Sequence, residues 1–212
     1  MAYAGCEIVK RRPHDLGACA VFILALNAPS FAQQYSFRNY GAAEGLQNLT
    51  VLSLAQDGAG YIWAGTEGGL YRYDGTRFRL MAGFEGLPCA TEVHALHVAP
   101  DGALWANTCN HVYRWDGQGF HAIAELGSML SGAQGMANDP GGGVVVATPS
   151  GLYEVAPGGA GSLAARPYPL GPELSGKESR GIARSGSQLW FGCERQLCVE
   201  DRGRISKFGP AE

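Results

Sequence analysis

Apolar and polar residues alternate over short stretches of the chain, most clearly between residues 51 and 80. The stretch at 51–56 alternates, those at 61–66 and 70–74 are rich in aromatic and aliphatic residues, and a further stretch surrounds Phe78. Turn dipeptides separate these stretches: Asp57-Gly58, Gly68-Gly69 and Asp74-Gly75. Alternation with a period of two, interrupted by such turns, predicts four strands in an antiparallel meander.

The same pattern recurs four times along the chain at a spacing of about forty residues. The repeats cover approximately 45–82, 86–124, 132–157 and 178–208. We align one position of the second strand in all four, at steps of 42, 41 and 44 residues: Trp63, Trp105, Val146 and Trp190. Because valine replaces tryptophan in the third repeat, we expect that repeat to pack differently.

A four-stranded meander of about forty residues has the size of one β-propeller blade. The sequence therefore predicts an all-β fold: a β-propeller of four-stranded antiparallel blades that is incomplete, with about four blades present. No segment shows a sustained helical period. The chain ends in residues 207–212, which resemble residues 39–44 before the first repeat, so a fifth repeat is expected to follow.

Aromatic residues that recur at one position in every repeat are expected to form the blade core rather than a sugar-stacking platform. They are Trp63, Trp105, Trp190, Tyr71, Tyr113 and Tyr153. A ligand site would instead use residues that differ between blades. The loops at 83–91 and 158–175 are candidates, including Phe84-Glu85 and the residues 166–168.

Composition agrees with many short strands and tight turns. The 212 residues include 32 glycines without a collagen period, and 46% are hydrophobic, which is enough for a core. The net charge of −3 and the sequence pI of about 6.0 provide no basic patch. Nucleic acid is therefore not an expected partner.

The first 32 residues have the features of a secretory signal peptide. Lys10, Arg11 and Arg12 precede the eleven-residue apolar run 16–26, and Ser30-Phe31-Ala32 provides small residues at the −3 and −1 positions of a cleavage site. Cleavage is expected after Ala32, which leaves 33–212 as the partial propeller. The alternative is an uncleaved membrane anchor, although the run is short for a membrane span.

Export implies an oxidising compartment, and four cysteines remain after cleavage. Two disulfides are therefore expected, with three possible connectivities. Cys193 and Cys198 are placed to face each other across a hairpin, and Cys89 and Cys109 could tie down the entry loop of their blade.

The remaining chemistry-bearing residues favour structural roles. His94 and His97, with His111 and His121 nearby, have a spacing that places the first two on opposite faces of a strand, so no metal site is predicted. The repeated Asp-Gly pairs lack the spacing of calcium loops and are assigned to turns. No catalytic motif, catalytic residue or cofactor-binding residue is identified, and no cofactor is expected.

The motif combination resembles the two-component regulator propeller repeat. It consists of Gly-Leu at 45–46 and 86–87, an Asp-Gly turn, a strand of the type x-I/L-W-x-G/N-T, and G-L-Y-R-Y-D-G at 69–75. The resemblance covers residues 35–212 and implies the periplasmic sensor region of a bacterial membrane signalling protein. In that family propellers precede a membrane helix and an output domain, commonly a histidine kinase or diguanylate cyclase.

The expected function is therefore that of an exported sensor or ligand-binding propeller, in the periplasm or secreted, without enzymatic activity in this chain. Its partner would be an extracellular ligand, for which carbohydrate is one candidate, or a second propeller or protomer. A membrane would be contacted only through a C-terminal segment beyond this chain or through an uncleaved signal. The alternatives are a secreted propeller enzyme, a polysaccharide lyase or glycosidase, and a purely structural interaction propeller.

Overall fold

The fold is described by a computed structural model for residues 36–81, 87, 92–108, 110–126, 134–157 and 163–209. The chain divides into two compact units, residues 1–39 and 40–212. In the first unit the described residues 36–39 have no regular secondary structure. The predicted signal peptide and its cleavage site at Ala32 lie outside the described residues. Within the described part, no helix has the length and apolar character needed to cross a membrane.

The second unit is built from four antiparallel sheets of four strands each, which follow one another along the chain. A short 3-10 helix, η1 (Ala42–Glu44), precedes them. Sheet 1 contains β1 (Val51–Gln56), β2 (Ile62–Thr66), β3 (Gly69–Tyr73) and β4 (Phe78–Leu80). Sheet 2 contains β5 (Val93–Val98), β6 (Leu104–Thr108), β7 (His111–Trp115) and β8 (Phe120–Glu125). Sheet 3 contains β9 (Met136–Asn138), β10 (Val144–Thr148), β11 (Gly151–Pro157) and β12 (Leu163–Pro167). Sheet 4 contains β13 (Ser179–Ser185), β14 (Gln188–Cys193), β15 (Gln196–Asp201) and β16 (Arg204–Phe208).

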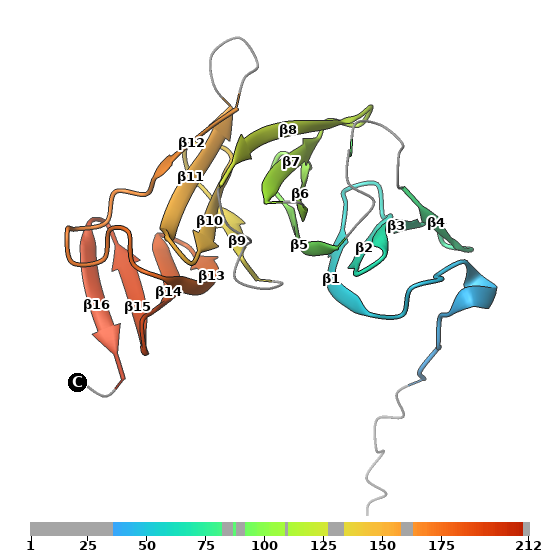
Figure 1. Cartoon of the computed structure of the whole chain (residues 1–212), viewed down its shortest axis with the longest axis horizontal. Helices are drawn as coiled ribbons and strands as arrows, with labels where there is room; N and C mark the ends of the chain where they lie inside the picture. The colour runs from blue at the N-terminus through green and yellow to red at the C-terminus, as the bar shows by residue number, and fades with distance from the viewer. Residues whose placement is uncertain are drawn as a thin grey trace, which may run out of the picture. The chain divides into compact units, whose positions relative to one another are not determined.

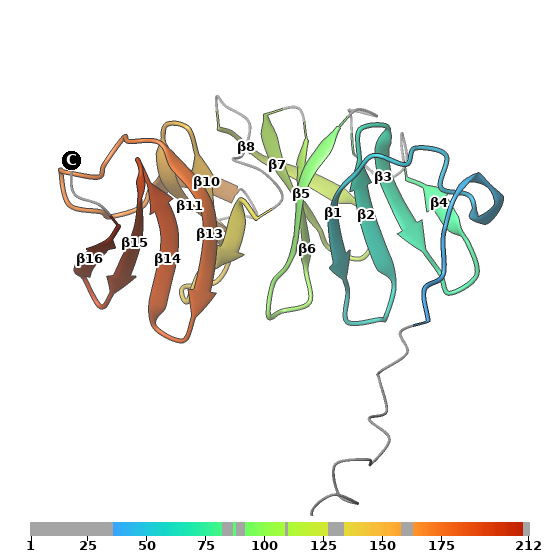
Figure 2. The same ribbon diagram turned by 90° about the horizontal axis from the view of Figure 1, so that it is seen from below.

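Within each sheet the strands lie in sequence order, as the alternation and the turn residues predict. The first strands β1, β5, β9 and β13 are neighbours from sheet to sheet, and the outer strands β8 and β12 also contact each other. Figures 1 and 2 show the four sheets of the second unit side by side, with the first and fourth at opposite ends of an open row. The predicted fold, an incomplete β-propeller, is confirmed.

The third repeat extends beyond its predicted limit at residue 157. β12 (Leu163–Pro167) pairs with β11 as the fourth strand of sheet 3, with Ala165 opposite Val155 and Pro167 opposite Tyr153. The expectation of a loop over the whole of 158–175 is therefore wrong, and Arg166 lies on a strand. The residues of β12 are mostly small and carry little intrinsic strand preference, so pairing with β11 rather than local propensity creates this strand.

The strand register corrects the alignment of the third repeat. Thr66 and Thr148 occupy the same position, because each pairs with the glycine that opens the next strand. Three residues before Thr148 stands Val145, and three residues before Thr66 stands Trp63. Val145, and not Val146, therefore replaces the tryptophan. The run of three valines offers no aromatic residue that would fix the register from sequence.

Each sheet has one face toward the sheet before it, here called the leading face, and one toward the sheet after it, the trailing face. Trp63 of sheet 1 shares a buried cluster with Leu96 and Tyr113 of sheet 2, so the tryptophan position belongs to the trailing face. Val145 accordingly packs with Ile182 and Phe191 of sheet 4, while Val146 packs with Trp105 of sheet 2. The core of the unit thus lies between consecutive sheets.

The residues predicted for the blade core differ in burial. Trp63, Trp105, Tyr71 and Tyr113 are buried, whereas Tyr153 and Trp190 are only half-buried. Tyr153 packs at the margin of the cluster between sheets 2 and 3. Trp190 lies on the trailing face of sheet 4, which no described sheet covers, and stacks on Phe208 with ring centroids 6.1 Å apart. A side chain at the tryptophan position is therefore fully buried only where another sheet packs on the trailing face.

Candidate functional site

A cleft of about 320 Å³ opens between sheets 1 and 2, at the end of the sheets where the first strand turns into the second. It is lined by three segments: 57–59 and 101–103 from two turns, and 114–117 from the end of β7 and the turn after it. The side chains that give it chemical character are Asp57, Asp101, Arg114, Trp115 and Asp116. A cleft with carboxylates, a guanidinium and an indole suits a small polar ligand.

The turns at 57–61 and 99–103 have the same backbone structure. In each turn, the N–H of the first residue donates to the carbonyl of the fifth residue. The carbonyl of the first residue accepts from the N–H of the fourth, which is Gly60 in one turn and Gly102 in the other. Both glycines have positive φ, 89° and 82°. By this equivalence Asp57 corresponds to Ala99, and Asp101 corresponds to Ala59. The two Asp-Gly pairs at 57 and 101 therefore occupy different turn positions, although the sequence suggests that they match.

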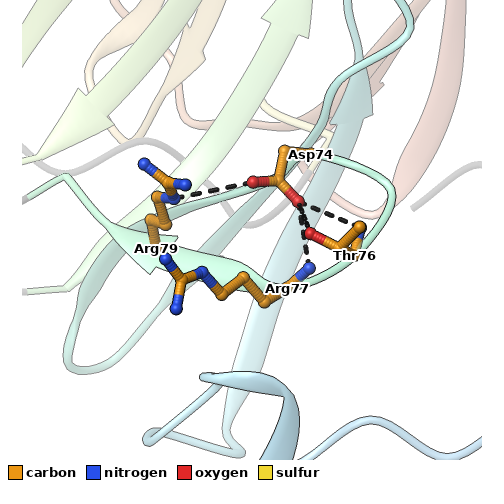
Figure 3. A network of polar contacts seen from close by, with 4 residues as sticks. All are labelled: Asp74, Thr76, Arg77 and Arg79. Atoms are coloured by element: carbon orange, nitrogen blue, oxygen red, sulfur yellow. Dashed lines mark hydrogen bonds and ion pairs between the residues drawn. The ribbon is translucent and has the colours of Figure 1, made fainter.

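A second kind of turn recurs at the outer strands. Asp74 Oδ1 accepts backbone N–H groups of Thr76 and Arg77, and its Oδ2 lies 3.5 Å from Arg79 Nε, as Figure 3 shows. The hydroxyl of Thr76 also donates to this carboxylate. These hydrogen bonds, that from the Thr76 hydroxyl first, hold the pKa of Asp74 well below its usual range.

Asp116 repeats this arrangement at the rim of the cleft. Its Oδ1 accepts the N–H groups of Gln118 and Gly119, and its Oδ2 lies 2.8 Å from His121 Nε2. The backbone hydrogen bonds, and then His121, lower the pKa of Asp116 to about 2. Asp101 accepts from the N–H of Ala103 and, at 2.9 Å, from Arg114 Nη2. These contacts lower its pKa as well. The carboxylates of Asp101 and Asp116 are thus charged at neutral pH.

Arg114 packs within sheet 2, whereas Trp115 reaches across to sheet 1. The Arg114 guanidinium lies over the ring of Trp105 at 6.0 Å, while the Trp115 ring packs 5.9 Å from Trp63 and 4.9 Å from Phe120. Trp115 is half-buried, so one part of its indole contributes to the core and another part to the cleft. This is the usual arrangement of an aromatic residue at a recognition surface.

Two of the cleft side chains, Trp115 and Asp101, vary between otherwise equivalent sheets. The register places Trp115 at the same position as Tyr73, Val155 and Glu200. Asp101 in sheet 2 stands at the turn position that Ala59 occupies in sheet 1 and Gly141 in sheet 3. Side chains that differ while the scaffold repeats are candidates for recognition, as the sequence indicates in general terms. An alignment of the repeats by their Asp-Gly pairs does not reveal this cleft, because it treats Asp101 as the counterpart of Asp57 and not of Ala59.

A second polar group lies where the first strands of sheets 2, 3 and 4 meet. Asn138 links all three, since its Oδ1 lies 2.6 Å from His97 Nε2 and its carbonyl accepts from Arg184 Nε at 2.7 Å. Burial, and then Glu154, raise the pKa of the adjacent Asp139. These residues hold neighbouring sheets together.

The histidines examined as metal ligands are dispersed. His94 lies 3.1 Å from Glu92, His97 contacts Asn138, and His121 contacts Asp116. The ring of His111 lies beside Tyr113. Within the described ranges, no group of three or more histidine, cysteine or acidic residues is arranged to hold a metal ion.

Cys193 and Cys198 form a disulfide, with Cα atoms 5.8 Å apart, across the hairpin between β14 and β15. Both residues are buried in the cluster between sheets 3 and 4. Their predicted pairing is confirmed. Cys89 and Cys109, like Phe84 and Glu85, lie outside the described residues.

Residues 45–68 match the family described as "Two component regulator propeller", and this match confirms the family resemblance of the repeat. The matched segment contains β1, β2 and the turn at 57–61. The chain thus contains a repeat of this family, and its fold is that of an incomplete propeller. No sequence match was found among curated proteins.

Solved structures share the fold at low sequence identity. The extracellular domain of a hybrid two component system from B. thetaiotaomicron matches with 20% identity and a TM-score of 0.60, covering 81% of this chain and 26% of that one. The extracellular domain of a one component system from the same organism matches with 19% identity and a TM-score of 0.55, covering 79% and 23%. Virginiamycin B lyase from Staphylococcus aureus matches with 16% identity and a TM-score of 0.55, covering 74% and 55%. The chain therefore spans about a quarter of the length of the two extracellular domains.

Proposed function

We propose that the chain is the exported recognition part of a bacterial signal-transduction protein and binds a small polar ligand in the cleft between sheets 1 and 2. The observation that carries this proposal is the placement of Trp115 and Asp101, which differ from their counterparts in the other sheets, in one cleft of a repeated scaffold. The family match at residues 45–68 and the fold shared with extracellular domains of signalling proteins support it. Location outside the cytoplasm and a separate output domain are part of the proposal.

A ligand in this cleft would touch both sheets at once. The segment 57–59 belongs to sheet 1, while 101–103 and 114–117 belong to sheet 2. A ligand that binds only the folded cleft stabilises the pair of sheets by a free energy that rises with the logarithm of ligand concentration once that concentration exceeds Kd. In a signalling protein this change in stability would be passed on to the part that carries the output.

The chemistry of the cleft is compatible with a saccharide. The carboxylates of Asp101 and Asp116 accept hydrogen bonds from hydroxyl groups, and the exposed part of the Trp115 indole offers an apolar surface for a sugar ring. Arg114 adds hydrogen-bond donors. Each of these groups is already held in place by its own turn or by its neighbour, so little conformational freedom would be lost on binding.

The alternative function is that of a secreted enzyme, because virginiamycin B lyase and a gluconolactonase from Xanthomonas campestris share the fold. A general acid at neutral pH needs a raised carboxyl pKa. In the cleft the pKa values of Asp101 and Asp116 are lowered instead. This disfavours a general-acid role for Asp101 and Asp116 at this cleft. A structural interaction propeller would leave the cleft without a ligand.

The proposal is tested by calorimetric titration of the exported chain with glucose, galactose, N-acetylglucosamine, glucuronic acid and cellobiose. Trp115→Val introduces the residue that sheet 3 has at this position and should abolish binding of the sugar that the wild type binds. Tyr73→Val, at the same position of sheet 1 but outside the cleft, is the matched control and should retain it. Equal loss in both variants, or sugar turnover in place of binding, would contradict the proposal.

A further inference from the structure

We propose that the cleft between sheets 1 and 2 selects a small ligand that carries a positively charged amine, such as an amino sugar, over neutral and anionic compounds. The inference rests on the proposed function, because it concerns the same cleft and names the class of its ligand. Two independent observations carry it. Acidic side chains are in excess in the cleft, and its tryptophan ring lacks the cation that covers two other tryptophans of the chain.

The excess of acidic side chains follows from the lining residues. They include three aspartates, Asp57, Asp101 and Asp116, and one arginine, Arg114. Arg114 is paired with Asp101 at 2.9 Å, so its charge is compensated within the cleft itself. His121 contacts Asp116 from an exposed position outside the lining. Because a cleft lined mainly by one sign of charge concentrates ligands of the opposite sign, this one favours cations.

The carboxylates can accept further hydrogen bonds. Asp101 accepts from the N–H of Ala103 and from Arg114 Nη2, whereas an ionised carboxylate offers about four lone-pair sites. Oδ2 of Asp116 accepts from the exposed ring of His121. An ammonium group has three N–H donors and no acceptor, so it matches groups that only accept.

Trp115 differs from the two core tryptophans of sheets 1 and 2. Arg72 lies over the ring of Trp63, with its Cζ 5.5 Å from the centroid, and Arg114 lies over Trp105 at 6.0 Å. In both pairs the arginine stands directly opposite the tryptophan on the neighbouring strand. The sheets thus build a cation–π contact at each of these two positions.

The neighbours of Trp115 provide no such cation. Leu104 lies opposite it on one side and Phe120 on the other, and both are buried and apolar. Among the residues that the structure describes, no arginine or lysine lies over the Trp115 ring. Asp116 follows directly in the chain and lines the same cleft. A ligand ammonium at the exposed part of the indole would therefore gain both a cation–π contact and a carboxylate partner.

An anionic ligand meets the opposite situation. Arg114 is the one basic residue among those that line the cleft, and its guanidinium is engaged by Asp101. A carboxylate in the cleft would face the aspartates without a free cation to compensate it. A neutral sugar would make hydrogen bonds without a net electrostatic attraction. The expected order of affinity is therefore cationic, then neutral, then anionic.

The test is calorimetric titration of the exported chain with glucosamine, glucose, N-acetylglucosamine and glucuronic acid, near neutral pH. These probes share a pyranose ring of similar size and differ chiefly in charge. Glucosamine should bind at least about tenfold more tightly than glucose, because only its amine is charged. N-acetylglucosamine, in which an amide replaces the amine, should lose this preference, and glucuronic acid should bind most weakly.

Matched variants assign the preference to the cleft. Asp116→Asn keeps the side-chain oxygen that accepts the turn N–H groups but removes the charge, and it should reduce the preference for glucosamine over glucose at least about threefold. Asp74→Asn makes the same change in the corresponding turn of sheet 1, outside the cleft lining, and should leave the preference unchanged. Trp115→Phe should retain binding with a smaller preference, because phenylalanine is a weaker cation–π partner. Circular dichroism verifies that each variant is folded.

The possible failures can be told apart. If glucose or N-acetylglucosamine binds as tightly as glucosamine, the inference is overturned while ligand binding by the cleft stands. An equal loss of preference in Asp116→Asn and Asp74→Asn would also overturn it. If none of the four probes binds, the inference fails, and the proposed function is then decided by its own titrations with galactose and cellobiose.

Discussion

The indole Nε1 of Trp63 donates a 2.7 Å hydrogen bond to Oδ2 of Asp57, so the turn that opens β2 is tied to the tryptophan of the trailing face. In sheet 2 the equivalent tryptophan, Trp105, is buried with its Nε1 unpartnered within the described residues, because Ala99 replaces the aspartate. Sheet 3 shows the reverse, with Asp139 at the acid position and Val145 at the tryptophan position. Among the described residues, the pair is complete only within 45–68, the segment that matches the family.

We predict that Asp57→Ala destabilises the chain by about 2 kcal/mol, since it leaves the buried Nε1 of Trp63 without an acceptor and removes the caps on Ala59 and Tyr61. Ala99→Asp should have the opposite effect, of about 1 kcal/mol, because it supplies the acceptor that Trp105 lacks. Urea unfolding measures both changes. Equal destabilisation by the two substitutions would refute the equivalence of positions 57 and 99.

Asp116 should make the chain acid-sensitive. Its pKa is lowered from 3.8 to about 2 by the N–H groups of Gln118 and Gly119 and by His121. A carboxyl whose folded pKa lies below its unfolded pKa contributes stability above the unfolded value, and this contribution is lost as the pH falls toward the folded value. Wild type should therefore exceed Asp116→Asn in stability near neutral pH, and the two should converge between about pH 4 and pH 2. Unfolding midpoints across this range provide the measurement, and a constant difference down to pH 2 would contradict it.

The Cys193–Cys198 disulfide should stabilise sheet 4 and its packing on sheet 3, where both sulfurs are buried. Replacing both cysteines by serine is expected to cost roughly 2 kcal/mol, which is modest because the closed loop is short. Thermal unfolding with and without reductant gives the same comparison in the wild type. A double variant with unchanged melting temperature would count against this role.

Gly45 is predicted to tolerate no side chain. Its φ is +89°, and a Cβ at this position would meet the carbonyl oxygen of Phe78. Gly45→Ala should therefore destabilise the chain by about 2 kcal/mol or more. Gly58→Ala is the matched control, because nothing lies within 4 Å of its added Cβ and it has no positive φ. Chemical denaturation of both variants distinguishes backbone strain at Gly45 from a general effect of losing glycine.

Most of the fold could be predicted from the sequence because its signals are local. The strands of sheet 1 and the hairpin that joins Cys193 and Cys198 follow from alternation and turn residues. β12 was missed because Ala164 and Ala165 carry no strand signal and only pairing with β11 makes the strand. The tryptophan position of sheet 3 was misplaced because three consecutive valines are equivalent in sequence and differ only in the face to which they point.

The candidate site was predictable only in principle. The sequence indicates that ligand-contacting residues should differ between repeats. The Asp-Gly pairs make Asp101 look equivalent to Asp57, but the turn hydrogen bonds show that Asp101 is equivalent to Ala59. Trp115 both packs on Trp63 and borders the cleft, a double role that only the packing of two sheets reveals. Whether a residue packs in the core or borders the cleft depends on the neighbouring sheet, and the local sequence does not contain that information.

The account depends most on the stacking of repeated sheets in one register, and a double-mutant cycle tests it directly. Val145 packs with Phe191 between sheets 3 and 4, and Val146 packs with Trp105 between sheets 2 and 3. The substitutions Val145→Ala and Phe191→Leu should show a coupling free energy of about 0.5 kcal/mol or more, whereas Val146→Ala and Phe191→Leu should be additive. Additivity of the first pair with coupling in the second would contradict the register and the order of the sheets.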